Sequence, residues 1–82
     1  MKVLKFSASW CGPCKMLGKI IESVKDQTDM SIEEVDIDQQ TELAKQYQIR
    51  GVPTLVLLDN AGNEVKRKSG AMTGPQFLEF IK

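Results

Sequence analysis

The chain has 82 residues, the length of one small domain, and this leaves no room for a second hydrophobic core. Eleven Lys and Arg residues balance eleven Asp and Glu residues, which argues against binding nucleic acid by bulk charge. No apolar run approaches the ~18–20 residues of a membrane span, and Lys5 interrupts the first apolar stretch, so we find no signal-peptide core. We therefore expect a cytoplasmic monomer that contacts neither nucleic acid nor membrane.

The first half of the chain predicts a strand, a helix and a second strand. Residues 2–7 form the first strand. From Gly12 or Pro13 to about Lys25 the apolar residues recur with helical spacing, and a turn at residues 27–29 follows. Gly18 costs this helix about 1 kcal/mol relative to Ala. The second strand spans residues 31–37.

The second half predicts a short helix, a hairpin and a last helix. Asp38 is expected to cap a helix that runs to about Tyr47. The continuous apolar run 54–58 indicates a strand covered on both faces. A loop at 59–63 then leads to a strand at 64–68, whose Lys66, Arg67 and Lys68 suit an exposed edge. Thr73 and Gln76 form a capping box that opens the last helix.

The resulting order, β-α-β-α-β-β-α, places the chain in the α/β class. We expect a four-stranded mixed sheet with helices on both faces. Each of the first two helices is predicted to make a right-handed crossover between parallel strands, and the hairpin adds an antiparallel strand at one edge.

The only cysteines, Cys11 and Cys14, lie in the segment Trp10-Cys11-Gly12-Pro13-Cys14-Lys15. A zinc site needs four ligands, whereas the chain offers two thiols and no histidine. A structural disulfide here would close a very small loop and add little stability. The third interpretation is a redox-active dithiol, which a Cys-x-x-Cys motif beside a βαβ pattern favours.

The position of the pair suits redox chemistry. The first strand ends near Ser7 and the helix begins at Cys11 or Gly12, so the first thiol lies at a helix N-terminus. Free N–H groups and the positive end of the helix dipole stabilise a thiolate there, and the thiolate is the attacking species in disulfide exchange. Cys14 lies one turn further on. Pro13 lacks an N–H, which is harmless in a first turn, and Gly12 leaves the sulfur accessible.

This segment resembles the active-site signature of the thioredoxin family. Asp36-Ile37-Asp38 is similar to the end of the family's following strand. Gly51-Val52-Pro53-Thr54 resembles the loop with its cis-proline, and Ser69-Gly70-Ala71 the glycine loop before the last helix. The resemblance covers essentially the whole chain and implies a thioredoxin fold in a single domain, residues 1–82.

The resemblance also implies roles for individual residues. Cys11 is the nucleophile and Cys14 resolves the mixed disulfide. Trp10 belongs to the substrate-contacting rim, although a ring at this point could also fill the core. A cis bond at Pro53 turns the Val52 backbone outward, where it can pair with an extended substrate strand. Gly70 leaves room for that substrate, although it could be a simple turn residue.

Several positions depart from the family's pattern. The usual N-terminal strand and helix are absent, so we predict the sheet order 2-1-3-4, with strand 31–37 as an acidic edge. Lys5 occupies the place of the family's buried acid, and Glu34 that of a neighbouring Lys. Lys19 replaces a helix proline, and Ser7 a second Trp. We expect Lys5 and Glu34 to form an inverted ion pair below the dithiol, with Glu34 supplying the carboxylate. The alternative is that both reach solvent separately.

The resemblance implies a protein-disulfide reductase that takes part in electron transfer and cell redox homeostasis. It is recharged by a thioredoxin reductase, to which NADPH and FAD belong, because this chain has no dinucleotide motif and binds no cofactor or metal itself. A glutaredoxin-like, glutathione-dependent reductase is the second enzyme interpretation, and a non-redox subunit of a larger assembly is the third. Replacement of both cysteines with Ser would abolish an enzyme and spare such a subunit.

Overall fold

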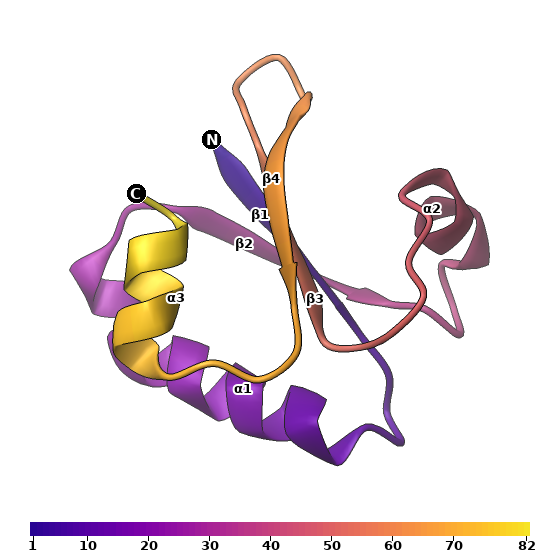
Figure 1. Ribbon diagram of the computed structural model, residues 1–82, viewed down its shortest axis with the longest axis horizontal. Coiled ribbons are helices and arrows are strands. Elements are labelled where there is room, and N and C mark those ends of the chain that lie inside the picture. The colour runs from indigo at the N-terminus through magenta and orange to yellow at the C-terminus, as the bar shows by residue number, and fades with distance from the viewer.

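Figure 1 shows the computed structural model of residues 1–82, a four-stranded sheet with helices on both faces. The strands are β1 (Lys2–Ser7), β2 (Ser31–Asp36), β3 (Thr54–Leu58) and β4 (Glu64–Ser69), in the order β2-β1-β3-β4. Helices α1 (Gly12–Val24) and α3 (Gly74–Phe80) cover one face, and α2 (Thr41–Gln46) covers the other. A 3-10 turn, η1 (Lys25–Gln27), follows α1. The predicted fold class and strand order are confirmed.

The direction of β3 differs from the prediction. β1 and β2 are parallel, but β3 runs antiparallel to β1, so only α1 makes a crossover between parallel strands. Phe6 of β1 pairs with Val35, near the end of β2, and with Thr54, at the start of β3. The connection through α2 therefore returns the chain to the end of the sheet where β2 finished, and β3 runs back antiparallel to β1.

The two faces of the central strands carry separate hydrophobic clusters. On the α1 and α3 side, Val3, Leu55 and Leu57 pack against residues such as Leu17 and Phe77. The other face meets α2 through a second cluster: Leu4, Phe6, Val35, Val56 and Leu58. Every residue of β3 is buried, as its apolar run predicts for a strand covered on both faces.

The outer strands β2 and β4 form the edges of the sheet. All six residues of β4 are exposed, and its Lys66, Arg67 and Lys68 guard that edge as predicted. The Lys66 ammonium lies 5.4 Å from the centre of the Phe80 ring. On the opposite side, β2 is an edge strand that carries Glu33 and Glu34, as expected.

The two predicted caps have different outcomes. The box at α3 is present, since the Thr73 hydroxyl accepts from the Gln76 N–H and the Gln76 side chain accepts from the Thr73 N–H. The expectation that Asp38 caps α2 is wrong. That helix begins at Thr41, and its N-cap Gln40 makes no side-chain bond. No helix of the chain is long and apolar enough to cross a membrane.

Candidate active site

Cys11 and Cys14 form a disulfide at the start of α1, with 5.3 Å between their Cα atoms. β1 ends at Ser7, and a short loop then brings the Cys11 N–H onto the Ala8 carbonyl, 3.1 Å away. Cys11 is the N-cap of α1, and Pro13 lies in the first turn as predicted. Both cysteines are buried, so the protein fixes the position of the two sulfurs.

One hydrogen bond makes the surroundings of the two sulfurs different. The backbone N–H of Cys14 donates to the Cys11 Sγ at 3.1 Å. This N–H is one of the groups that a helix N-terminus leaves without a backbone acceptor. When the disulfide is reduced, the same N–H and the helix dipole stabilise negative charge on the Cys11 sulfur.

The loop before β3 forms one wall of the site. Val52 packs against the cluster of Ala8, Cys11 and Cys14. The bond between Val52 and Pro53 is cis, as predicted. The Pro53 carbonyl accepts from the Gly70 N–H at 2.8 Å, so this loop and the loop before α3 are tied together.

Gly70 has a φ of +94°, a conformation that a side chain disfavours, and an added Cβ would meet no atom within 4 Å. The backbone alone therefore explains a glycine at this position. The idea that it also leaves room for a substrate stays a prediction.

Trp10 lies on the surface beside the disulfide, with 68% of the residue exposed, so it does not fill the core. Its indole Nε1 donates to Asp38 Oδ2 at 2.9 Å. The Asp38 N–H in turn donates to the Asp36 side chain at 2.8 Å. The carboxylate that was expected to cap α2 instead orients the indole. The sequence contains no signal for this contact between residues 28 positions apart.

The predicted ion pair between Lys5 and Glu34 is present. The two residues are register partners on β1 and β2, and Lys5 Nζ lies 3.8 Å from Glu34 Oε1. The Ser7 hydroxyl donates to the same oxygen at 3.1 Å. A cavity of about 200 Å³ brings Lys5, Ser7 and Glu34 to one space with Cys14. The sequence marks Ser7 only as a departure from the family's pattern and carries no sign of its contact with Glu34.

Three comparisons with known proteins agree with this geometry. The sequence profile of the Thioredoxin family matches residues 1–82. The chain belongs to the thioredoxin family. A thioredoxin of Mycoplasmoides gallisepticum is 37% identical over 81 residues, which cover 98% of this chain and 80% of that protein. A bovine mitochondrial thioredoxin is 39% identical over 82 residues, or 98% of this chain and 49% of that one.

Solved structures show the same relationship. A mutant thioredoxin from Halobacterium salinarum superposes with a TM-score of 0.90 at 38% identity, and the match covers 98% of this chain and 70% of that one. Reduced thioredoxin pre-protein from Schistosoma mansoni gives a TM-score of 0.88 at 31% identity over 98% of this chain and 74% of that one.

As a thioredoxin, the protein is a thiol–disulfide oxidoreductase whose redox group is the Cys11–Cys14 pair. The exchange needs no bound cofactor, because the two sulfurs themselves carry the two electrons. No group of three or more potential metal ligands gathers anywhere in the structure. Because the two sulfurs are bonded to each other at a thioredoxin site, the zinc interpretation of the cysteines is wrong.

Proposed function

We propose that this thioredoxin works as a protein-disulfide reductase, with Cys11 as the attacking thiolate. The observation that carries the proposal is the hydrogen bond from the Cys14 N–H to the Cys11 Sγ. Negative charge is stabilised on Cys11, and the thiolate is the species that attacks a disulfide.

The reaction has two exchanges. The Cys11 thiolate attacks one sulfur of a target disulfide, which forms a mixed disulfide and releases the other target sulfur as a thiol after it takes up a proton. Cys14 then loses its proton and attacks Cys11 Sγ. The Cys11–Cys14 disulfide forms and the second target thiol leaves, so two electrons pass from the protein to the target.

We further propose that the target binds as an extended segment beside the disulfide. The Val52 backbone would pair with it, the Trp10 ring would form the rim, and Gly70 would leave it room. The support is the arrangement of these residues around the disulfide. Val52 packs on the cysteine cluster, and the Gly70 N–H donates a hydrogen bond to the carbonyl of Pro53, the residue after Val52. The Trp10 ring is exposed on the surface beside the disulfide.

The protein is recharged, in this proposal, by a cytoplasmic thioredoxin reductase that holds the NADPH and FAD. The test compares insulin reduction by thioredoxin reductase and NADPH with reduction of hydroxyethyl disulfide by glutathione. Rapid turnover in the first assay alone supports the proposal. Rapid turnover in the second assay alone would point to the glutaredoxin-like function instead.

The two cysteines are distinguished by trapping. Cys14→Ser should accumulate a mixed disulfide between Cys11 and the target, because the resolving thiol is missing. Cys11→Ser is the matched control and should trap none. Equal trapping by the two variants would overturn the assignment of Cys11 as the nucleophile.

Glu34 is proposed to move the proton on or off Cys14. Glu34 and Cys14 both line the cavity of about 200 Å³. The Glu34 carboxylate accepts a hydrogen bond from the hydroxyl of Ser7, which lines the same cavity. Glu34→Gln should slow release of the mixed disulfide by Cys14 more than it slows the attack by Cys11. An unchanged release rate in rapid-mixing experiments would rule out this role.

A further inference from the structure

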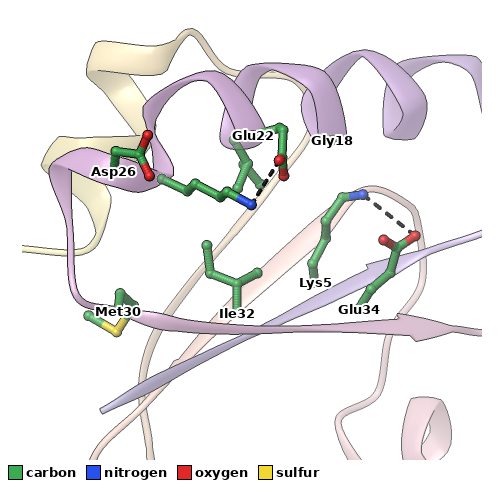
Figure 2. Close-up of a pocket in the computed structure, with 9 residues that line it drawn as sticks. Lys5, Gly18, Glu22, Asp26, Met30, Ile32 and Glu34 are labelled. Carbon is green, nitrogen blue, oxygen red and sulfur yellow. Dashed lines mark ion pairs between the residues drawn. The ribbon is translucent and has the colours of Figure 1, made fainter.

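Lys5 is the one charged residue in the buried interior of this protein, and its side chain is only 6% exposed. It lies in the middle of β1, between Glu34 of β2 and Leu55 of β3. Figure 2 shows its side chain rising from the sheet toward α1, with the ammonium under that helix. A buried charge is expensive, so its position calls for a physical explanation.

Lys5 and Cys14 line the same cavity. Gly18 follows Cys14 by one helical turn on the same face of α1. A Cβ added at Gly18 would be 3.2 Å from Lys5 Nζ, so the ammonium sits directly against the helix there. The cavity of about 200 Å³ opens onto Lys5 and Cys14 together.

The carboxylate partner of Lys5 balances this charge only in part. The Glu34 side chain is 67% exposed, and water screens a carboxylate in that position far more than it screens the buried ammonium. The distance of 3.8 Å is also too long for a hydrogen bond. Of this pair, Lys5 is therefore expected to contribute more to the field at Cys14 than Glu34 does.

Other charged groups around Lys5 lie nearer to solvent. Glu22 and Lys25 pair with each other at 2.8 Å. The remaining charged residues that line the hollows around Lys5 are Lys15, Lys19, Asp26 and Asp36. Two lysines and two aspartates leave no net charge among them, so they do not reverse the field of the buried ammonium.

We propose that Lys5 is a positioning residue that acts through Cys14: its charge stabilises the Cys14 thiolate and shifts the redox equilibrium toward the reduced protein. The equilibrium is the reaction of the Cys11–Cys14 disulfide with two glutathione thiols, which gives the protein dithiol and one glutathione disulfide. Two electrons pass to the protein. Any proton that leaves Cys14 goes to solvent, and only the resulting thiolate interacts with the charge of Lys5.

The central test is Lys5→Met in glutathione buffers of known composition. The substitution removes the charge and keeps an unbranched apolar side chain, while Glu34 stays hydrated. We expect the equilibrium constant for reduction to fall about three- to tenfold at alkaline pH, where tenfold corresponds to ~30 mV. The difference should shrink at acid pH, because both thiols are then protonated and Lys5 has no thiolate to stabilise. A merely structural effect of the substitution would not depend on thiol ionisation.

Two further variants fix the sign of the effect. Glu34→Gln removes the screened anion and keeps Lys5, so it should raise the same equilibrium constant by a smaller factor. If Lys5→Met does not fold, Glu34→Gln still tests in which direction the charges near Cys14 shift the equilibrium. Lys19→Met removes a lysine from the exposed side of α1 and is the matched control, with no change expected.

An unchanged or higher constant in Lys5→Met would overturn the proposal, as would a loss that is equal at all pH values. A lower equilibrium constant for reduction in Glu34→Gln than in the wild type would also overturn the proposal. These are equilibrium measurements, so they do not depend on whether Glu34 carries the proton or on which partner reduces the protein. Failure of the proposed reductase function would leave their outcome unaffected.

Discussion

Gly18 in α1 lies against the ammonium of Lys5 in β1, so closely that a methyl group at position 18 would have to push the ammonium aside by a few tenths of an ångström. An added Cβ would be 3.2 Å from Nζ, closer than most side-chain contacts in folded proteins. A glycine inside a helix weakens it by about 1 kcal/mol relative to alanine. The contact gives this unfavourable residue a physical reason, since a side chain at position 18 would need the buried ammonium to move.

The first prediction is that Gly18→Ala and Lys5→Met are coupled. In the wild-type background, Gly18→Ala should gain little or nothing, because the new methyl group displaces the ammonium. In the Lys5→Met background the clash is relieved, and the alanine should stabilise the protein by about 0.5–1 kcal/mol. Urea unfolding of the four proteins of this cycle measures the coupling. Additive effects within ~0.3 kcal/mol would show that the contact is unimportant.

Local patterns predict most elements, but they do not predict contacts between distant segments. The helical spacing of α1, the apolar run of β3 and the capping box at Thr73 each depend on neighbouring residues, and all three are confirmed. The direction of β3 depends on which end of the sheet the connection from β2 returns to, and residues 37–53 are long enough to reach either end, so local patterns do not decide it.

The site shows the same division. The spacing and flanking residues of Cys11 and Cys14 are enough to identify the redox pair from the sequence alone. Ser7 reaches Glu34 only because β1 and β2 pair in one register, and a serine at the end of a strand has no distinctive pattern. Aspartate is common at helix caps, so the sequence favours that role for Asp38, whereas the tertiary structure gives it the indole of Trp10.

A second prediction concerns this contact between Trp10 and Asp38. Asp38→Ala should free the indole and raise the KM for a protein disulfide about two- to fivefold, as expected for loss of one exposed hydrogen bond. The rate with a small disulfide should be unchanged. Stability should change by less than about 0.5 kcal/mol, because Asp38 lies on the surface. Asp38→Asn, which keeps an acceptor oxygen, is the control and should stay close to wild type.

Steady-state kinetics with insulin and hydroxyethyl disulfide provide this comparison. The fluorescence of Trp10, the only tryptophan in the chain, reports directly whether the ring has moved. Equal KM values for Asp38→Ala and wild type, with altered fluorescence, would show that the orientation of the ring does not affect substrate binding.

A third prediction separates the two explanations for Gly70. Gly70→Ala should destabilise the protein by about 1–2 kcal/mol, because its φ of +94° disfavours a side chain. If the methyl group also crowds an extended substrate, insulin reduction should fall more than reduction of a small disulfide. Gly62→Ala is a matched control, since Gly62 has a φ of +86° and lies in the distant hairpin loop. It should lower stability and leave the ratio of the two activities unchanged. The same ratio in both variants would leave the backbone as the only reason for glycine at position 70.

The last prediction concerns Asp59, whose carboxylate organises the loop between β3 and β4. The backbone N–H groups of Asn63 and Ala61 both donate to Asp59 Oδ1 at 2.9 Å. These bonds, that of Asn63 first, lower the pKa of Asp59 below its ordinary value. A carboxylate with a lowered pKa in the folded state stabilises the protein above the pKa of the unfolded state. That contribution is lost as the pH falls through the lower, folded value.

Asp59→Ala should therefore have a lower Tm than the wild type at neutral pH, and the difference should shrink in acid. Asp59→Asn keeps an oxygen that can accept the two N–H groups but has no charge to lose. Its Tm should fall between the other two at neutral pH, and it should lack the part of the acid dependence that comes from Asp59. Thermal unfolding followed by circular dichroism from neutral to strongly acid pH measures all three proteins. A difference between Asp59→Ala and wild type that stays constant over this range would mean that charge on Asp59 does not stabilise the hairpin loop.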